Sequence, residues 1–566
     1  MLSTRTLKRI LILWLAIGIL SLVWLALMPM DANRGHIFNY KLLRLLLGGG
    51  TALILIGLFA FYQRFIRDED LAQNLCARWE QALTAHSQTL AQTRFWLIIA
   101  FIFAVECYLL SYLAIPVPAR PLIAWMAFIF LSTIITLTLT YRDYFRARPR
   151  LIWHIKTHWR SWQPVQQRTL LALALLGLIY FCLFIPINAS GPIHPDEDVI
   201  YPDVVNMLIG GETFSKTLSD SFIISSWWYG YPYFPISAIP LIIPRIIFGE
   251  AFAQNVNLNL LLMRQFVSVL PMVLSLIFMV YIVDGFKHFW ASIGMFITLA
   301  LVPAVVQYNI RFWHPDSIIL FLVLLAIFLL ERDKLRFGSN FYWAAAVIGF
   351  NAVIKVWGLF FFLAIAGYLL AGWITKKLTF TRMLRAGILF ILVMLLAIII
   401  TSPSILIPWN LKTYIAELKE YYPVMREGYD EPDPEGVYRL GLDAWLPFIR
   451  RLFMQDFYFW FALAALGLGS LLGRKKMLYR LLLSWCLVAG GFLVLFIAVK
   501  SFQYILVVLM PMYMGVFLLP HIAGGEHYPK WCAFLSKPVA VKVLTLLVSA
   551  LTLINTYFNV HLLPKL

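Results

Sequence analysis

The tripeptide His-Pro-Asp occurs twice in the chain, at 194–196 and again at 314–316. The first copy continues directly into Glu197 and Asp198. Carboxylates that are crowded together near an apolar boundary lose hydration and repel one another, and both effects raise the pKa of such groups. A group of this kind is suited to accept a proton from a hydroxyl, so the two segments are candidates for general-base chemistry.

Helix capping is the simpler explanation for the same carboxylates. Acidic residues at 196–198 would interact well with the N-terminal dipole of a short helix, and Asp316 after Pro315 could begin the next helix in the same way. Capping does not explain why Arg311 and His314 stand beside Asp316. Both explanations remain open from the residues alone.

Isolated cations follow at the ends of otherwise apolar segments. Lys355 lies between two short apolar blocks, and Lys500 follows another block, with Tyr504 one helical turn later. Each lysine could simply extend its ammonium group to the lipid headgroups. Together with Arg311, however, they would form a positive site next to the carboxylates, able to hold an anionic group while a nucleophile is activated.

The composition indicates whether these residues belong to a water-soluble protein or to a membrane protein. The chain has 566 residues, of which 61% are hydrophobic and 13% are charged, whereas soluble domains carry about 25% charged residues. A water-soluble fold is therefore excluded. The apolar residues fall in blocks of about twenty, the length that crosses the hydrocarbon core of a bilayer. We predict an all-α integral membrane protein, a polytopic helical bundle of about 13–15 transmembrane helices with long outer loops that carry interfacial helices.

Fifteen apolar blocks support this prediction. Those at 317–331, 341–354 and 357–373 are short, so one hairpin among them could be re-entrant. The blocks lie at 10–29, 42–62, 95–115, 121–140, 169–188, 265–283, 290–308, 317–331, 341–354, 357–373, 386–407, 453–472, 481–499, 502–520 and 540–560.

The distribution of charge indicates which side each connection faces. Arg5, Lys8 and Arg9 precede the first block, which places the N-terminus in the cytoplasm. Alternating from there puts the basic connections 142–168, 332–336, 376–385 and 474–480 inside, and both His-Pro-Asp segments outside. The formal charge of +18 is thus a topology signal and does not indicate a nucleic-acid partner. The five cysteines form no C-x-x-C pair and indicate neither a disulfide framework nor a zinc site.

These assignments divide the chain into four parts. Residues 1–141 are an N-terminal extension of four transmembrane helices, and 142–168 are a basic cytoplasmic connector. Residues 169–520 form the core, with outer loops at 189–264 and 408–452, and residues 521–566 hold a connector and the last helix. The first loop is rich in Trp and Tyr and contains the amphipathic run 235–248, so we expect it to lie along the membrane interface.

At this point the chain resembles the C-type glycosyltransferases (GT-C), polytopic enzymes that use polyprenyl-phosphate-linked sugars. The likeness is greatest to protein O-mannosyltransferases and related bacterial sugar transferases, and it covers roughly 169–520. It rests on the order and common sidedness of several motifs, none diagnostic alone. Family members usually place the acidic loop directly after their first transmembrane segment, whereas this chain has four additional segments, at about 10–140, ahead of that arrangement. The motifs are Asp196-Glu197, NMLIGG at 206–211, YPYFP at 231–235, RIIFG at 245–249, residues 311–317, GFNAVIK at 349–355, and KSFQY at 500–504 with Pro511.

The resemblance implies a mechanism and a set of roles. Asp196 would be the general base that takes the proton of an acceptor hydroxyl, and Glu197 and Asp316 would orient it or bind a second polar group. The donor phosphate would lie near Arg311, Lys355, Lys500 and Tyr504, with the polyprenyl tail in a groove between helices. The sugar would be transferred in one displacement with inversion to a lipid, a glycan or a protein.

A metal ion is an open element of this mechanism. His194, Asp196, Glu197, His314 and Asp316 offer nitrogen and oxygen ligands for Mg²⁺ or Mn²⁺, but nothing in their spacing demands an ion.

Two other functions are compatible with a polytopic chain. A transporter or a flippase of lipid-linked sugars would place its ionisable residues along a path through the membrane, whereas only Glu106 stands deep in a predicted span. A non-catalytic scaffold of the cell envelope would explain the four extra helices but would leave both His-Pro-Asp segments without a role. We expect a multi-pass protein of the inner or plasma membrane, with its site on the non-cytoplasmic face.

Overall fold

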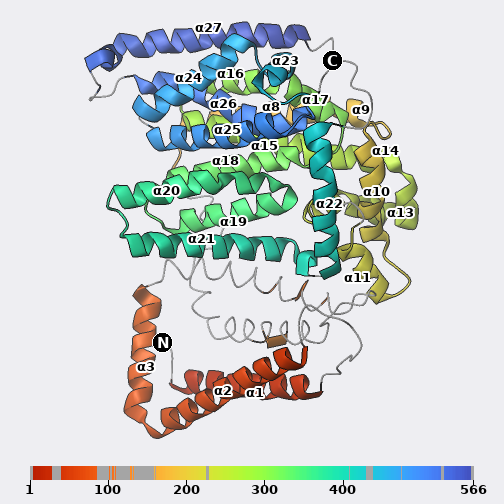
Figure 1. Cartoon of the computed structure of the whole chain (residues 1–566), viewed down its shortest axis with the longest axis vertical. Coiled ribbons are helices and arrows are strands. Elements are labelled where there is room, and N and C mark those ends of the chain that lie inside the picture. Colours follow the sequence, from red (N-terminus) through yellow and green to blue (C-terminus); the bar gives the residue numbers. More distant parts are fainter. Residues whose placement is uncertain are drawn as a thin grey trace. The chain divides into compact units, whose positions relative to one another are not determined.

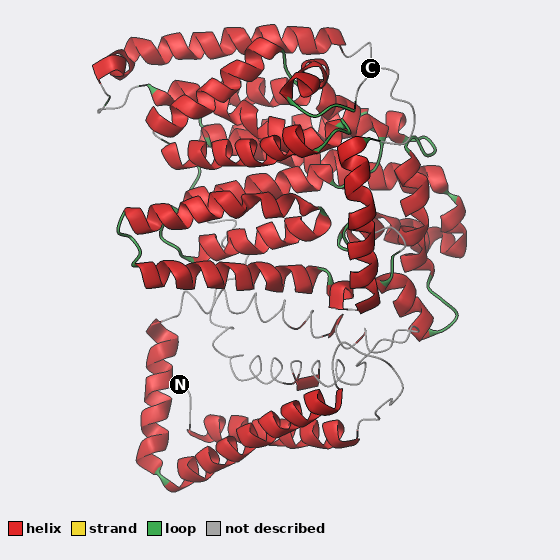
Figure 2. Cartoon of the chain, in the orientation of Figure 1, coloured by secondary structure: helices red, strands yellow, loops and turns green. Residues whose placement is uncertain are grey.

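The computed structural model in Figure 1 describes most of the chain. The described ranges are 4–27, 40–85, 161–224, 229–406, 408–428, 438–472, 475–523 and 530–562, with residue 528 and isolated positions between 101 and 159. In these ranges every regular element is a helix and none is a strand (Figure 2).

The apolar helices confirm an all-α polytopic membrane protein. The described residues contain nine helices that are long and apolar enough to cross a membrane, or up to eleven if two bent pairs each count as one span. Most residues of the predicted spans 95–115 and 121–140 and of the connector 142–168 lie outside the described residues. The total of 13–15 helices therefore stays a prediction.

The chain divides into two compact units. The first contains Met1–Thr157, Gly210–Ile223 and Pro403–Leu411. Its N-terminal helices are α1 (Thr4–Leu27), α2 (Tyr40–Arg67) and α3 (Glu69–Ala85), and buried apolar side chains from all three, among them Leu11, Phe65 and Ala72, form one cluster. Short helices α11 (Phe214–Phe222) and η5 (Pro403–Leu406) also belong to this unit.

The second unit contains His158–Ile209, Ile224–Ser402 and Lys412–Leu566, and with them both His-Pro-Asp segments. Its centre is formed by α18 (Asp316–Asp333), most of whose side chains are buried, and by α26 (Phe502–Phe517), whose side chains are almost all buried. A helix of eighteen residues is about 27 Å long, so the two ends of α18 lie about one bilayer thickness apart. Between them, apolar residues such as Leu320, Val323 and Ile327 are fully buried.

Other helices of this unit surround α18 and α26. The outward faces of several of them are apolar and exposed, as at Leu384, Ile388 and Ile391 of α21, which suits contact with lipid. These helices are α8 (Pro164–Leu183), α15 (Leu270–Asp284), α16 (Phe289–Ala300), α17 (Pro303–Arg311), α19 (Ser339–Ile354), α20 (Phe362–Ile374), α21 (Phe380–Thr401), α24 (Asp456–Leu472), α25 (Lys476–Phe496) and α27 (Pro538–Leu562).

The predicted outer loop 189–264 is largely helical. It contains α10 (Pro195–Ile209), α12 (Tyr233–Ala238), η1 (Ile239–Leu241), α13 (Ile242–Phe248), η2 (Gly249–Gln254) and α14 (Val256–Met263). In Figure 1, α10 runs crosswise to α18–α21, as does α22 (Pro408–Glu427). This arrangement suits helices of the interface, although Tyr233–Gln254 would also be long and apolar enough to span a membrane.

The long helix that follows this loop begins earlier than the predicted block. A single candidate span runs from Val256 to Asp284 through α14, the π-helical turn η3 (Arg264–Val269) and α15, so it begins earlier than residue 265. The predicted block starts directly after Arg264. In the fold, the Arg264 side chain is 0% exposed and ion-paired, so it does not end the helix.

Sharp bends occur within one predicted span and directly before another. The segment predicted at 290–308 is broken between α16 and α17, whose axes differ by 65° before and after Pro303. Helix α23 (Leu442–Leu452) meets α24 at 106° and presents apolar residues such as Trp445 and Ile449 to the core. The second outer loop thus contributes a helix that lies across the end of the bundle.

Candidate functional site

A buried ion pair between Glu197 of α10 and Arg264 of η3 forms the foundation of the site. Both side chains are 0% exposed. Arg264 donates from Nε to Oε1 at 2.9 Å and from Nη2 to Oε2 at 2.6 Å. Two-point pairing of this kind is the strongest geometry available to a guanidinium and a carboxylate.

The same pair joins the two His-Pro-Asp segments. The Glu197 carboxylate accepts from the backbone N–H of Ile193 at 2.9 Å and from that of Trp313 at 2.7 Å. Arg264 donates its remaining hydrogens to the carbonyls of Asn188, Ser190 and Gly191. Glu197 was predicted as a candidate catalytic group, and the structure places it where it fixes the backbone of both segments.

Asp196 lies next to this pair but faces outward. Its side chain is 36% exposed, as is that of His194. Tyr229 donates its hydroxyl hydrogen to Oδ2 of Asp196 at 2.7 Å, and Nδ1 of His194 lies 3.5 Å from the same oxygen. The His194 ring stacks on Phe312 at 4.4 Å between centroids, so the two segments also touch through their side chains. Asp196 thus combines a fixed position with access from outside.

His314 is the buried partner of the same tyrosine. Its Nε2 lies 2.6 Å from the Tyr229 hydroxyl, and its Nδ1 contacts a carboxylate oxygen of Asp316. The ring is 0% exposed, and its backbone N–H donates to Oγ of Ser268 at 3.1 Å. Burial lowers the pKa of His314 below its ordinary value, and the nearby Asp316 carboxylate only partly offsets this effect.

Asp316 connects His314 with Lys355. The carboxylate is 0% exposed, and Nζ of Lys355 lies 3.1 Å from Oδ2 and 3.3 Å from Oδ1. The Lys355 side chain keeps 14% of its surface exposed. Its ammonium group lies 5.7 Å from the ring centre of Tyr229 and 5.0 Å from that of Tyr504, which are cation–π distances. One chain of contacts therefore leads from Asp196 through Tyr229, His314 and Asp316 to Lys355.

A backbone contact at Gly230 holds Tyr229 against the end of α19. The Gly230 N–H donates to the carbonyl of Ile354 at 2.9 Å. A Cβ atom at this position would lie 1.4 Å from the carbonyl oxygen of Val353. Only glycine allows so close an approach, and the approach brings Tyr229 next to Lys355.

The remaining predicted residues are placed as follows. Tyr504 lies beside Lys355, and its hydroxyl is 2.8 Å from that of Tyr421 in α22. Lys500 donates from Nζ to the carbonyls of Arg439 at 2.6 Å and Ala498 at 2.9 Å, and lies 5.6 Å from the ring centre of Trp445. Arg311 ends α17, and its side chain lies outside the described part of the structure.

Two residues of the site were not predicted. Tyr229 is one of several aromatic residues in its loop, and nothing in the sequence distinguishes it from Tyr231 or Tyr233. Arg264 could have been identified from the sequence, because a single arginine within a long apolar run needs a partner if the run is buried.

The possible metal ligands do not form a metal centre in this geometry. Among the described residues, no three His, Cys, Asp or Glu side chains are arranged to hold an ion. Both oxygens of Glu197 are bonded to Arg264, and Asp316 is paired with Lys355. The described donor set therefore does not suit Mg²⁺ or Mn²⁺.

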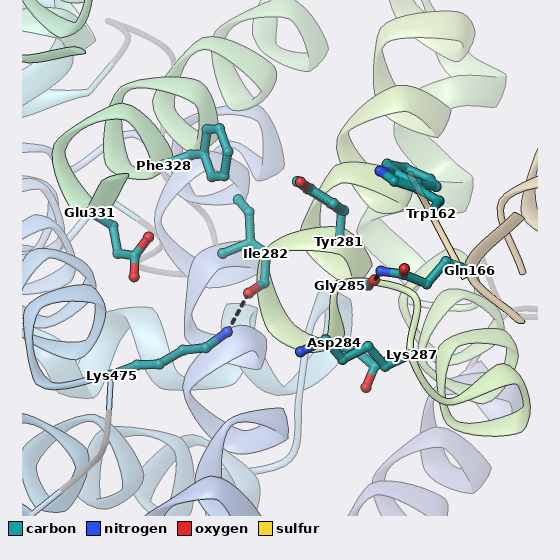
Figure 3. A pocket seen from close by; sticks show the side chains of 10 residues that line it. All are labelled: Trp162, Gln166, Tyr281, Ile282, Asp284, Gly285, Lys287, Phe328, Glu331 and Lys475. Carbon is teal, nitrogen blue, oxygen red and sulfur yellow. Dashed lines mark hydrogen bonds between the residues drawn. The ribbon is translucent and has the colours of Figure 1, made fainter. Parts of the chain in front are cut away.

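A separate pocket of about 300 Å³ lies at the other end of α18 (Figure 3). Glu331, in its lining, is about 22 Å from Asp316 along the helix axis. Lys475 donates from Nζ to the carbonyls of Ile282 at 2.9 Å and Val283 at 3.2 Å, and burial lowers the pKa of this lysine. Gln166 donates to the carbonyl of Gly285 at 2.8 Å. These groups satisfy the last carbonyls of α15, which is a structural role.

Comparison with protein-family models, with curated proteins and with solved structures gave no match. The geometry of the site therefore carries the functional argument.

Proposed function

We propose that the protein is an inverting glycosyltransferase that uses a polyprenyl-phosphate-linked sugar, with Asp196 as its general base. The observation that carries the proposal is the position of Asp196 and Lys355. Each is partly exposed, and they stand at the two ends of one chain of contacts that runs through Tyr229, His314 and Asp316. In one displacement reaction, a carboxylate fixed in this way can take the proton of the attacking hydroxyl, and an ammonium group fixed in this way can stabilise the leaving group.

The chemistry follows from these two groups. Asp196 takes the proton of the acceptor hydroxyl while that oxygen attacks the anomeric carbon. The bond from the anomeric carbon to the phosphate oxygen breaks, and its electron pair remains on the leaving phosphate. Lys355 gives two donors to Asp316 and has a third for the phosphate, whose growing charge it stabilises more strongly here than in water.

The other assignments belong to the same proposal. Arg311 and Lys500 would supply further positive charge to the donor phosphate, and Tyr504 would confine the Lys355 ammonium group. Glu197 would position both segments. The chain would be a member of the C-type glycosyltransferases with its N-terminus in the cytoplasm and its site on the non-cytoplasmic face of the inner or plasma membrane. The acceptor would be a lipid, a glycan or a protein hydroxyl.

The alternative of a transporter or flippase receives less support. A transporter holds its substrate near the midplane, between polar or broken helices. Along the described middle of α18, the inward side chains are apolar and fully buried, as at Leu320, Val323 and Leu324. The ionisable cluster lies at one end of that helix.

A transfer assay with purified protein in detergent tests the proposal. The wild-type protein, given labelled polyprenyl-phosphate sugars and candidate acceptors, is expected to release polyprenyl phosphate. Asp196→Asn should lower the rate by about 10²–10⁴-fold, the usual contribution of a general base. Asp198→Asn is the control, because Asp198 is exposed and has no part in the proposed reaction. Full activity of Asp196→Asn, or translocation of the intact donor in vesicles without cleavage, would overturn the proposal.

A further inference from the structure

We propose that Tyr229 and His314 act as a proton-holding pair for Asp196, in which the Tyr229 hydroxyl reverses its direction of donation when Asp196 takes up a proton. This inference rests on the proposed function and concerns what happens to the proton after it leaves the acceptor. It assigns positioning roles to two residues that act through Asp196.

The contacts of this network outnumber the hydrogens available to fill them. Three short contacts link four side chains: Asp196 to Tyr229 at 2.7 Å, Tyr229 to His314 at 2.6 Å, and His314 to Asp316. Each contact needs one hydrogen between its two heavy atoms. With both carboxylates ionised and the imidazole neutral, Tyr229 and His314 supply only two. The network is therefore one hydrogen short.

The position of the missing hydrogen follows from the charges. The Asp316 carboxylate holds the imidazole hydrogen on Nδ1, because a lone pair there would face a negative oxygen. Tyr229 then donates to ionised Asp196, and Nε2 of His314 is left facing the tyrosine oxygen without a hydrogen. Asp196 is the only member of the chain with substantial access from outside.

Proton uptake by Asp196 supplies the missing hydrogen. The acceptor O–H bond breaks, and its hydrogen binds to the Asp196 carboxylate, which then donates to the tyrosine oxygen. The Tyr229 hydroxyl turns to Nε2 of His314, and Nδ1 continues to donate to Asp316. All three contacts are then complete hydrogen bonds, so the proton is held and does not return to the new glycosidic oxygen. After product release, water or the leaving phosphate takes this proton from Asp196.

The surroundings of His314 determine the pH range in which the pair works. The titratable and charged groups around the ring come from every neighbouring element. Burial lowers the pKa of the imidazole, so the ring is neutral near pH 7. At lower pH, a protonated His314 would already carry a hydrogen on Nε2. The Tyr229 hydroxyl could then no longer donate to this nitrogen when Asp196 takes up a proton. The titratable and charged groups around the His314 ring are His194, Asp196, Glu197, Tyr229, Tyr233, Arg264, Tyr308, Asp316 and Lys355.

The test measures kcat and KM for the donor across pH in the transfer assay. Tyr229→Phe removes the hydroxyl and keeps the ring beside Lys355, and His314→Gln removes the titrating group. Each should lower kcat by about ten- to a hundredfold, a part of the ~10²–10⁴-fold contribution of a general base, and leave the donor KM within about twofold. The wild type should lose activity as the pH falls through the lowered pKa of His314, below the ordinary range of an imidazole, and this decline should be absent in His314→Gln.

Tyr233→Phe is the matched control. Its ring is buried one turn away, stacked on Trp313, and its hydroxyl has no hydrogen-bond partner among the described residues. It should retain the wild-type kcat and the wild-type acidic decline. If Tyr229→Phe behaves like Tyr233→Phe, or if His314→Gln keeps the acidic decline, the inference is wrong while the proposed function stands. A wild-type protein that transfers no sugar would instead remove the proposed function and, with it, the use of this pair.

Discussion

Glu197 and Arg264 use all the hydrogen-bonding capacity of their side chains within the protein. The carboxylate accepts four hydrogen bonds, two of them from backbone N–H groups, and the guanidinium donates to this carboxylate and to carbonyls of residues 188–191. Loss of either charge would leave the other buried without compensation. Such losses are much more costly than loss of a surface ion pair.

Glu197→Gln is therefore expected to destabilise the protein by about 3–5 kcal/mol. The measurement is the midpoint of thermal unfolding in detergent, together with the fraction of monodisperse protein after purification. Asp198→Asn, one residue on and exposed, should stay within about 0.5 kcal/mol of the wild type. Equal unfolding midpoints for the two variants would contradict a structural role for the pair.

Part of the site could be predicted at this scale. Asp196, His314, Asp316 and Lys355 were found because ionisable residues are conspicuous in an apolar chain, and the structure brings them into one network. Tyr229 was not found, because its selection over neighbouring tyrosines depends on the docking of Gly230 against α19, which is a tertiary contact. Arg264 was not singled out, since its partner Glu197 lies far away in the sequence.

At the level of elements, the approach of Gly230 to the C-terminal end of α19 fixes the distance between Tyr229 and Lys355. The backbone of the turn lies directly on the carbonyls of Val353 and Ile354. No side chain can be inserted between them. The turn and the helix end therefore act as one support for Tyr229 and Lys355.

Gly230→Ala should reduce transfer activity by about a hundredfold, because a displacement of about 1 Å at a reacting group has an effect of this size. The added Cβ would otherwise lie 1.4 Å from an oxygen atom. The transfer assay measures the loss. Gly367→Ala in α20 is the control, since a Cβ there meets no atom within 4 Å, and it should leave activity unchanged. Wild-type activity of Gly230→Ala would show that the close approach has no part in positioning the site.

Hydrophobic length predicted most of the helices but not their breaks. The apolar blocks correspond to α8, α15, α18 to α21 and α24 to α27, because burial in lipid or in the core requires similar residues. The 65° bend at Pro303 and the 106° bend before α24 were missed. These depend on where the following segment packs, and the composition of a block contains no information on that.

For the molecule as a whole, the two ends of α18 differ in chemistry. Asp316 and its partners occupy one end, and Glu331 and the pocket around Lys475 occupy the other. The buried apolar residues between them separate the two regions. The sidedness predicted from the basic connections can be tested by labelling one exposed position on each side.

In a variant without the five native cysteines, we expect Asp198→Cys to react with a membrane-impermeant thiol reagent from the non-cytoplasmic side. Arg382→Cys, at the beginning of α21 and also exposed, should react only after the membrane is permeabilised. The degree of labelling in intact and permeabilised cells is the measurement. The opposite pattern would place the site on the cytoplasmic face and contradict the proposed location.

The order in which Glu197 and Arg264 occur in the chain has a consequence for biosynthesis. An arginine within an inserting helix opposes membrane entry, by about 2.5–3.5 kcal/mol at the helix centre and by less toward its ends. Glu197 is synthesised first and can neutralise Arg264 as soon as the helix from Val256 to Asp284 appears. The Trp313 amide arrives later and completes the four bonds of the carboxylate. A nascent chain halted before Trp313 would therefore contain both members of the charge pair but not the fourth hydrogen-bond donor to the carboxylate.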